Sequence, residues 1–325
     1  MPNLRVDVTV AILTFNGDRY LEQILARIAE QDFAGSVEVL VVDSGSTDGT
    51  LAIVGRHPNV RLHQIPNSEF GHGRTRNLAA QLATGKIVAF LTHDAVPADA
   101  HWLRELVDPF DRFPGVEGVV GRQIARRNCP PLLKYEIARV FSTQGPEFGT
   151  TVTYRTDAFD RVPHYWLPAA FYSDVNSAAR KEFLLKTIAY RDVDYAEDQL
   201  FGRDLLDGGY LKAYAARGAV EHSNDLTFRE YGKRIFDEIV GLRASGATVP
   251  PSPSWIRRVV RAVILDPADI VQDRDFSGGR KLYWLLVNPF WHIAKSSATR
   301  RARRVRLTDV EAIARASLER ERRES

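Results

Sequence analysis

The segment that decides the fold is GKIVAFLTHDAVP, which spans residues 85–97. Its first part, Ile87 to Leu91, is short and apolar and predicts a buried strand. This strand runs directly into Thr92, His93 and Asp94. In open α/β sheets the residues just beyond the strands face the ligand, so the segment predicts a binding role for Asp94.

Strands and helices alternate on both sides of this segment. Short apolar runs predict further strands, at residues 6–13, 37–42, 60–64, 116–123 and 150–154. Apolar residues at helical spacing predict helices, at residues 20–31, 50–57 and 74–83, and helical patterns dominate from residue 227 onwards. This alternation at short spacing favours an α/β fold with a parallel, doubly wound sheet.

The composition is that of an ordinary globular protein. The 325 residues have a net charge of +3 and are 44% hydrophobic, which suits one large α/β domain with a smaller addition. The single cysteine, Cys129, excludes an internal disulfide and a cysteine-based metal site. The sequence shows no signal-peptide core and no apolar run of about eighteen residues, so we expect a cytoplasmic protein without a transmembrane helix.

The second predicted strand ends in a polar turn, DSGSTDGT, at residues 43–50. Asp43 can accept a hydrogen bond from a base or a ribose there, and the small residues let a ligand approach the backbone. The alternative is a plain turn in which Ser, Thr and Asp cap the next helix. Neither G-x-x-x-x-G-K-[ST] nor a G-x-G-x-x-G after the first strand is present.

Three segments together carry a family resemblance: VAILTFNGDRYLEQILARIAEQ, VEVLVVDSGSTDGT and FGHGRTRNLAAQLATGKIVAFLTHDAVP. They resemble the N-terminal half of family 2 glycosyltransferases, closest to the bacterial rhamnosyltransferase-like branch, and the resemblance covers residues 6–230. It implies a GT-A fold, which is a Rossmann-like, mostly parallel sheet flanked by helices, with a C-terminal helical extension here. It also implies a nucleotide-sugar donor, a divalent metal ion (Mg²⁺ or Mn²⁺) and inversion at the anomeric carbon.

The resemblance also implies a domain division. Residues 1–226 would form the catalytic domain, with a nucleotide-sugar-binding half at 1–115 and an acceptor-binding half at 116–226. Residues 227–325 would form a helical C-terminal region.

The family usually carries D-x-D after its fourth strand, whereas this chain has Thr92, His93 and Asp94 there and keeps only the last acid. The resemblance therefore assigns Asp94 to the metal, because hard divalent cations prefer oxygen ligands. Thr92 would contact the ribose, and His93 would shape the donor site. His222, at the end of a predicted strand, is implied as a second ligand of the metal or the diphosphate. The alternatives are a turn-capping Asp94 and a structural His222.

The loop FGHGRTRN, at residues 70–77, supplies groups for the leaving diphosphate. His72, Arg76 and Asn77, together with the positive end of the following helix, can stabilise its negative charge. The alternative is that Arg74 and Arg76 form a solvated helix face. The resemblance places the remaining nucleotide-sugar contacts after the first two strands, at Thr14, Asn16, Asp43, Ser44 and Ser46.

A catalytic pair is predicted in YAEDQLFGRDLLDGGY, where Glu197 and Asp198 begin a helix. An acceptor hydroxyl must lose its proton as it attacks, and a positioned carboxylate contributes about 10²–10⁴ in rate. The resemblance places this general base at Asp198 and gives Glu197 an orienting role. The alternative is that both acids only stabilise the helix, because negative side chains interact favourably with the positive N-terminal end of the helix dipole.

The acceptor site is predicted around FYSDVNSAARKEF, at residues 171–183. Asp174, Asn176 and Ser177 can hydrogen-bond sugar hydroxyls. Trp166 and neighbouring aromatic residues could cover a sugar ring, and the alternative is that these aromatic side chains belong to the core.

The C-terminal region contains GGRKLYWLLVNPFWHIAKSSATRRARRVRL, at residues 278–307. The apolar run from Leu282 to Ala294 is too short to span a bilayer, and Pro289 interrupts it. Its aromatic residues and the basic cluster at 300–306 suit an anionic membrane surface, which would place the protein peripherally on the inner face of the cell membrane. The alternative is a helix packed on the catalytic domain. Nucleic-acid binding is not expected, because no nucleic-acid module accompanies the basic residues.

The sequence therefore predicts an inverting glycosyltransferase of cell-surface polysaccharide assembly. The expected donor is dTDP-L-rhamnose or, failing that, a UDP-sugar, and the expected acceptor is a glycan or a lipid-linked glycan. One alternative is a non-catalytic nucleotide-sugar-binding or membrane scaffold protein on the same fold. Another is a nucleotidyltransferase, which the segment TFNGDRY disfavours because it lacks a glycine-rich basic loop. The leading hypothesis requires Asp43, Asp94 and Asp198 to converge on one site.

Overall fold

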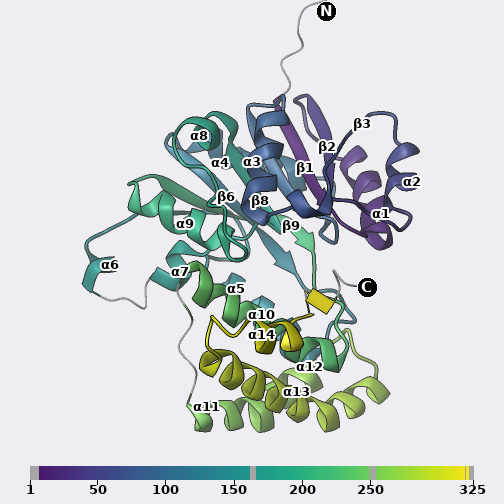
Figure 1. Cartoon of the computed structure of the whole chain (residues 1–325), viewed down its shortest axis with the longest axis vertical. Coiled ribbons are helices and arrows are strands. Elements are labelled where there is room, and N and C mark those ends of the chain that lie inside the picture. The colour runs from purple at the N-terminus through teal and green to yellow at the C-terminus, as the bar shows by residue number, and fades with distance from the viewer. Residues whose placement is uncertain (1–6, 162–165, 248, 250–253, 319, 322–325) are drawn as a thin grey trace, which may run out of the picture. The chain divides into compact units, whose positions relative to one another are not determined.

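The structure is a computed structural model that describes residues 7–161, 166–247, 249, 254–318 and 320–321. The chain divides into two compact units (Figure 1). The first unit comprises Met1–Ile124 and Arg139–His222, and the second comprises Ala125–Ala138 and Ser223–Ser325. Helix α5 (Pro131–Ser142) contributes residues to both units.

The N-terminal half of the first unit alternates strands and helices. Its strands are β1 (Val8–Thr14), β2 (Val37–Asp43), β3 (Val60–Gln64) and β4 (Ile87–Thr92). Its helices are α1 (Asp18–Ala29), α2 (Thr50–Gly55), η1 (Asn67–Glu69) and α3 (His72–Leu82). The seven elements predicted here are confirmed, with ends that differ by no more than two residues; the first predicted strand residue, number 6, lies outside the described residues.

The rest of the first unit completes a mixed sheet. Its strands are β5 (Val96–Pro97), β6 (Val116–Ile124), β7 (Thr150–Thr153), β8 (Asn176–Arg180) and β9 (Leu211–Glu221). Its remaining helices are α4 (Trp102–Arg112), α6 (Ala158–Arg161), α7 (Trp166–Ala170), α8 (Lys181–Lys186) and α9 (Glu197–Asp207). The strand order is β3-β2-β1-β4-β8-β6-β9-β5, and β7 pairs with β9. The predicted fold class is confirmed, and the sheet is mixed because β8 runs antiparallel to both β4 and β6.

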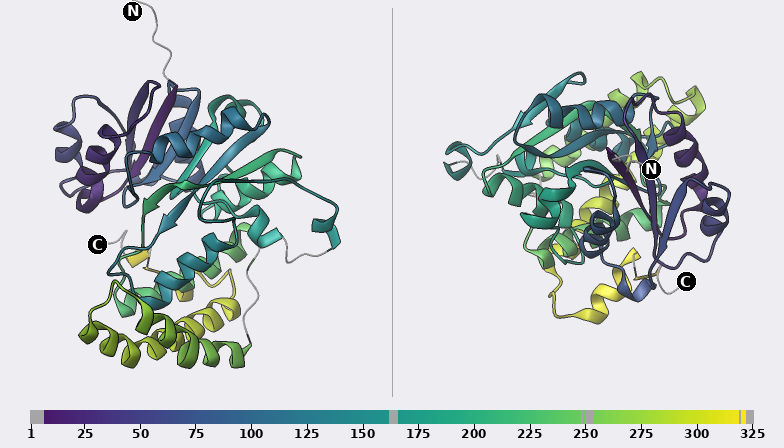
Figure 2. Two further views of the ribbon diagram at one scale, coloured as in Figure 1. Left: turned by 180° about the vertical axis from the view of Figure 1, so that it is seen from behind. Right: turned by 90° about the horizontal axis from the view of Figure 1, so that it is seen from above.

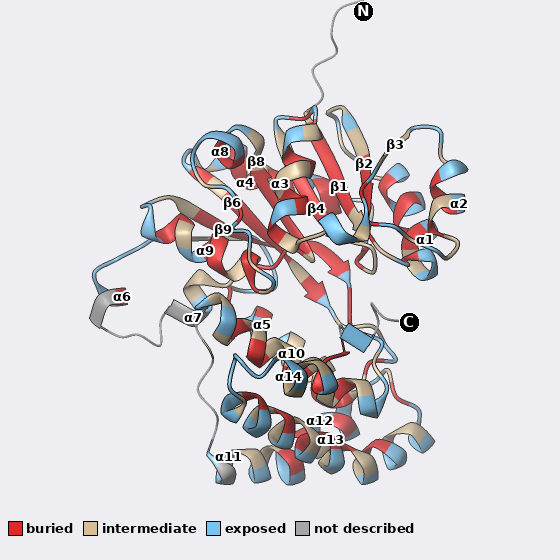
Figure 3. Cartoon of the chain, viewed as in Figure 1, coloured by how far each residue is buried: buried red, intermediate tan, exposed pale blue. Residues whose placement is uncertain are grey.

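Helices cover the sheet, so its central strands are buried (Figures 2 and 3). All residues of β1 are buried except Leu13, as expected of a parallel strand covered on both faces. Ile12 packs in one cluster with Ile24 of α1 and Trp102 of α4. Packing in this core holds β1, β2 and β4 in position, and the polar residues of the predicted site lie at the ends of these strands.

The strand register brings those ends to one edge of the sheet. Thr14 at the end of β1 lies opposite Asp43 at the end of β2, and Leu13 lies opposite Thr92 at the end of β4. The backbone N–H of Thr92 donates to the carbonyl of Val175, just before β8, at 3.4 Å. Polar residues that are distant in the sequence therefore meet beyond these strands.

The second unit is helical. Its elements are α10 (Phe228–Ser245), α11 (Trp255–Val260), the π-helical turn η3 (Arg261–Leu265), α12 (Asp266–Gln272), α13 (Gly278–Arg304) and α14 (Val310–Ala316). Thr227 and Glu230 form a capping box at the start of α10. Tyr231 of α10 and Trp284 of α13 pack against Trp291 in its core. None of the described helices has both the length and the apolar character needed to cross a bilayer.

Candidate active site

Asp43 organises the turn after β2. Its buried carboxylate accepts hydrogen bonds from the Thr14 hydroxyl at 2.9 Å, from the Ser46 hydroxyl, and from the backbone N–H groups of Gly45 and Ser46 at 3.1 and 3.0 Å. The Ser44 hydroxyl is also turned inward and donates to the carbonyl of Thr14 at 3.0 Å. A carboxylate has about four acceptor positions, so groups of the protein itself occupy those of Asp43. Among the described residues no side chain caps the following helix α2, so the alternative of helix-capping residues is not what the structure shows.

Asn16 joins the first two loops of the site. Its side-chain Oδ1 accepts from the backbone N–H of Thr47 at 2.8 Å, and its own N–H donates to the Ser46 hydroxyl at 2.9 Å. Asn16 is exposed and has a φ of 50°, a left-handed conformation that Asn tolerates better than most residues. The next residue, Gly17, lies so close to His93 that an added Cβ would come within 2.9 Å of its side chain. His93 therefore supports the first loop, consistent with its predicted shaping role.

Asp94 lies at the start of a chain of polar contacts. One carboxylate oxygen accepts from the Thr92 hydroxyl at 2.7 Å, and the other lies 3.3 Å from Nε2 of His222. The opposite nitrogen, Nδ1 of His222, lies 3.0 Å from Oε1 of Gln123, and Nε2 of Gln123 donates to the Ser173 hydroxyl at 3.0 Å. The imidazole of His222 therefore bridges the carboxylate of Asp94 and the amide of Gln123.

The Asp94–His222 pair fits a divalent cation. A carboxylate oxygen suits both Mg²⁺ and Mn²⁺, and an imidazole nitrogen is a softer ligand that favours Mn²⁺ of the two. Gln123 supplies the outer hydrogen bond that a metal-binding histidine usually has. Burial alone would raise the pKa of Asp94, but the charge and hydrogen bond of His222 outweigh it and hold this pKa well below its usual range. Across the described residues no three His, Cys, Asp or Glu side chains form a metal-binding group, so two protein ligands would leave most positions to the diphosphate and water.

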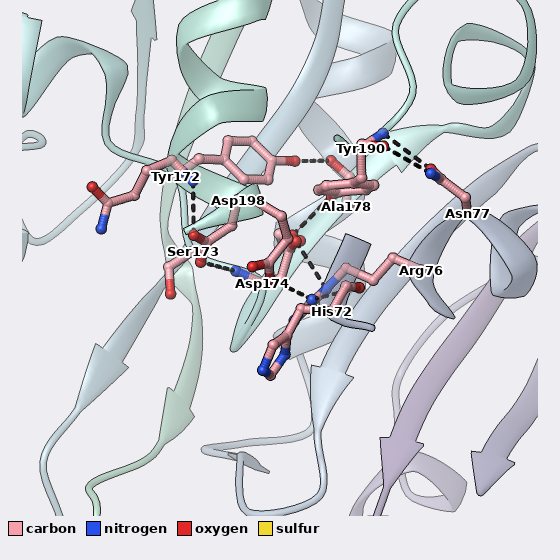
Figure 4. Close-up of polar contacts among 12 residues, drawn as sticks. His72, Arg76, Asn77, Tyr172, Ser173, Asp174, Ala178, Tyr190 and Asp198 are labelled. Carbon is pink, nitrogen blue, oxygen red and sulfur yellow. Dashed lines mark hydrogen bonds and ion pairs between the residues drawn. The ribbon is translucent and has the colours of Figure 1, made fainter. Parts of the chain in front are cut away.

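Arg76 lies at the centre of a buried cluster of charges (Figure 4). Its Nε lies 2.9 Å from Asp174, and its Nη1 lies 2.5 Å from Glu197 and donates to the carbonyl of His72 at 3.0 Å. Arg74, two residues earlier, is instead exposed and pairs with Asp192 at 3.4 Å. The solvated-face alternative is thus correct for Arg74 and wrong for Arg76, whose guanidinium is turned into the protein.

Further side chains predicted to bind ligand are held inside this cluster. Asp174 accepts from the hydroxyls of Ser177 at 2.5 Å and Tyr190 at 2.8 Å, and burial raises its pKa although Arg76 opposes the rise. The Asn77 amide donates to the backbone carbonyl of Tyr190 at 2.8 Å and accepts from its N–H at 3.0 Å. Asp174 and Asn77 therefore position the loop before α9 in this structure.

Asp198 is the half-buried acid of the cluster. It accepts from the backbone N–H of Asp174 at 3.3 Å and of Gln199 at 2.7 Å. Burial, followed by the charges of Glu197 and Asp174, raises its pKa well above the usual range, and Arg76 only partly opposes this. Such a shift makes a carboxylate a stronger base near neutral pH.

Strained backbone precedes this pair of acids. Ala196 has a φ of 63° and a ψ of 27°, and in the described chain only Asn16 shares a positive φ among non-glycine residues. Left-handed alanine costs about 1–2 kcal/mol and occurs where the surroundings enforce it, often at functional sites. Both examples lie in the loops that carry the predicted site.

The predicted acceptor residues divide into several groups. Asn176 is buried, where it accepts from the Trp102 indole at 2.9 Å and donates to the carbonyls of Arg122 and Gly218, so it anchors strands. Tyr172 is a core residue whose hydroxyl donates to the carbonyl of Ala178, as the core alternative describes. The side chain of Trp166, at the start of α7, lies outside the described part of the structure.

The three predicted acids approach one edge of the sheet. Asp94 is linked through His222 and Gln123 to Ser173, and the backbone N–H of the next residue, Asp174, donates to the carboxylate of Asp198. Asp43 lies at the same edge of the sheet, because the register of β1, β2 and β4 aligns the ends of these three strands. The arrangement thus places the Asp94–His222 pair and a carboxylate of raised pKa along a single connected network.

The sequence of this region also matches a known family. Residues 9–173 fit the sequence model described as glycosyl transferase family 2. The chain belongs to glycosyl transferase family 2. The resemblance stated from the motifs is confirmed, and this protein is a glycosyltransferase.

Two relatives of this glycosyltransferase are O-antigen chain rhamnosyltransferases. RfbN of Salmonella typhimurium strain LT2 is 29% identical over 253 residues, which cover 77% of this chain and 74% of RfbN. WbaN of Salmonella anatum is 30% identical over 202 residues, which cover 62% of this chain and 61% of WbaN.

Solved structures of other glycosyltransferases share the fold. The mannosyltransferase PcManGT from Pyrobaculum calidifontis, solved with GDP-Man and Mn²⁺, aligns with a TM-score of 0.56 at 20% identity, over 92% of this chain and 88% of its own. S. aureus TarS in complex with UDP-GlcNAc aligns with a TM-score of 0.54 at 21% identity, over 96% of this chain and 79% of its own. The glycosyltransferase therefore has a GT-A fold.

Sequence reasoning missed several residues of the site. The residues that hold His222, Asp174 and the acid pair in place are Gln123, Ser173, Tyr190 and Ala196. None of them was predicted to have a role, although Ser173 and Ala196 lie within the segments FYSDVNSAARKEF and YAEDQLFGRDLLDGGY. Only Tyr190 carried a usable signal, because an aromatic hydroxyl shortly before an acid pair must find a partner if it is buried.

Proposed function

We propose that this glycosyltransferase inverts the anomeric carbon of its donor by a single displacement, with Asp198 as the general base. The observation that carries the proposal is the position of Asp198, a half-buried carboxylate beside Asp174 at the start of α9; burial and the charges of Glu197 and Asp174 raise its pKa. A base of this kind is matched to the deprotonation of a sugar hydroxyl near neutral pH. Residues 1–226 would act as the catalytic domain, and residues 227–325 as its helical extension.

The acceptor oxygen attacks the anomeric carbon while its proton passes to a carboxylate oxygen of Asp198. The bond between the anomeric carbon and the diphosphate oxygen breaks, and the nucleoside diphosphate leaves with the electron pair. Arg76 holds Glu197 and Asp174 beside Asp198, so the three carboxylates keep their spacing during the reaction.

Asp94 and His222 would hold Mg²⁺ or Mn²⁺ on the donor diphosphate. A bound divalent cation neutralises the negative charge that develops on the leaving group. Gln123 fixes the ring of His222, and Thr92 donates to Asp94, so both ligands are oriented before the donor arrives. The Thr14–Asn16 and Asp43–Ser46 turns would enclose the nucleoside through their backbone groups.

The donor sugar that we propose is L-rhamnose carried by dTDP. The support is that its relatives RfbN and WbaN are both O-antigen chain rhamnosyltransferases. The acceptor would be a hydroxyl of a glycan or a lipid-linked glycan in cell-surface polysaccharide assembly. Such an acceptor would place the enzyme on the inner face of the cell membrane.

The test is a panel of dTDP-L-rhamnose, UDP-GlcNAc and GDP-mannose, each measured for hydrolysis and thermal stabilisation with Mn²⁺, with Mg²⁺ and with EDTA. We expect the rhamnosyl donor to stabilise the protein most, and EDTA to abolish hydrolysis. A preference for UDP-GlcNAc or GDP-mannose would replace the donor assignment. Full hydrolysis in EDTA would remove Asp94 and His222 from their proposed role.

A further inference from the structure

The helices of the second unit expose an unusual amount of apolar surface. Of the 22 large apolar residues that are exposed in the described part of the chain, 12 lie between residues 256 and 293. Isolated exposed leucines are common on soluble proteins, but a cluster of this kind marks an interaction site. The cluster belongs to a hairpin in which α13 returns alongside α11, η3 and α12 (Figure 1).

One side of α13 is packed and the other is exposed. Trp284 and Trp291 are buried in the core of the unit, whereas Leu282, Leu286 and Ile293 are each more than 60% exposed. At about 100° per residue these three side chains fall on one stripe of the helix. The exposed segments repeat along α13 and along the neighbouring row of helices (Figure 3).

The neighbouring row contributes a second stripe. Its exposed apolar residues are Ile256, Val259 and Val260 of α11, and Val263, Ile264 and Leu265 of η3. These six residues and Leu282, Leu286, Phe290 and Ile293 are termed the apolar face. Since α13 packs against η3 and α12, the two stripes belong to the same helical layer.

Positive charge borders the apolar face. From residue 276 to residue 308 the chain carries eight Lys and Arg residues and no Asp or Glu. Arg300 and Arg304 are exposed and lie on the same stripe of α13 as Leu282 and Leu286, about four to six turns further along the helix. The stripe thus changes from leucine and isoleucine to arginine along one helix.

We propose that the apolar face docks into the headgroup region of an anionic membrane, with the helix hairpin lying in the plane of the interface. An apolar stripe with cations beside it is the pattern by which interfacial helices bind acidic lipids. A dimer through this face would have to cover Arg300 and Arg304 without an acidic partner on the same stretch of a second copy, since residues 276–308 carry no Asp or Glu. This inference is independent of the transfer chemistry, because lipid binding needs neither sugar donor nor acceptor.

The test is co-sedimentation of the full chain with two kinds of vesicle, phosphatidylcholine alone and phosphatidylcholine mixed equally with phosphatidylglycerol. We expect strong binding to the mixed vesicles only, and weaker binding at high salt. Leu286→Asp and Ile293→Asp should each lower the partition coefficient at least about tenfold, since each removes a buried aliphatic side chain from the interface. Arg300→Glu combined with Arg304→Glu should abolish the preference for phosphatidylglycerol.

Phe148→Asp is the matched control, because Phe148 is 68% exposed on the first unit and should leave vesicle binding unchanged. Circular dichroism checks that each variant is folded. Wild-type binding by Leu286→Asp and Ile293→Asp would overturn the proposal. So would a lipid-free dimer, seen by sedimentation equilibrium, that Leu286→Asp dissociates while vesicle binding persists.

Discussion

Replacing Arg76 by methionine would keep most of the side-chain volume and remove one buried positive charge. The guanidinium is only 7% exposed and contacts Asp174 at 2.9 Å and Glu197 at 2.5 Å, whose side chains are 0% and 6% exposed. Removing one partner from a buried ion pair leaves an uncompensated charge, which costs about 3–5 kcal/mol. For a unit of about 200 residues this loss lowers Tm by roughly 6–20 °C.

The loss should depend on pH. Burial already raises the pKa of Asp174, and Arg76 lowers it, so the variant raises this folded-state pKa further. A carboxyl group with a raised folded pKa favours folding below its unfolded pKa of about 4, and this contribution is lost as pH rises through the folded value. The destabilisation of Arg76→Met should therefore be largest at neutral and alkaline pH and should shrink in acid.

Thermal unfolding followed by circular dichroism, in buffers from acid to alkaline, measures both effects. Arg74→Met is the matched control on the same helix, because its ion pair with Asp192 is exposed and contributes at most about 1 kcal/mol. Equal Tm values for the two variants at neutral pH would refute the buried-cluster argument. A Tm deficit of Arg76→Met that grows on acidification would refute the pH argument.

Three further predictions concern the site. Asp198→Asn should lower kcat by about 10²–10⁴ with donor affinity unchanged, and loss of donor binding in a folded variant would contradict this role. In the wild type, kcat/KM should rise with pH as Asp198 loses its proton, with a midpoint above the pKa of an ordinary aspartate. Gln123→Met should weaken Mn²⁺ binding in the presence of nucleoside diphosphate about 10–100-fold, measured by titration calorimetry, because His222 loses the side chain that orients its ring. If Gln123 has only a structural role, the variant should change Tm and leave Mn²⁺ affinity unchanged. Gly17→Ala should displace His93 and raise the donor KM, and an unchanged KM would show that the loop can move aside.

The parallel half of the sheet could be predicted because its strands carry their own signal. Runs such as VEVLVV at 37–42 are β-branched, apolar and of strand length. Strand β8, in contrast, has the sequence NSAAR and is held by its antiparallel pairing with β4 and β6. Its composition gave no strand pattern, so the change from a parallel to a mixed sheet could not be predicted from it.

The candidate site was predictable by position but only partly by side chain. Strand ends identified the edge where Asp43, Asp94 and Asp198 lie, since that edge follows from topology. The burial of Arg76 depends on Glu197, 121 residues further along the chain, and local sequence does not distinguish Arg76 from the exposed Arg74. Long-range pairing of this kind is visible only in the folded protein.

The left-handed backbone at Ala196 limits how the protein can be altered in the laboratory. Glycine at this position would relax the strain, yet it would also let the neighbouring acids sample more orientations. Branched side chains would add to the strain, because Cβ substituents crowd the preceding carbonyl in this conformation. Selection for thermal stability and selection for turnover should therefore favour different amino acids at residue 196. A library of substitutions at this one residue would separate the requirements of stability from those of catalytic rate.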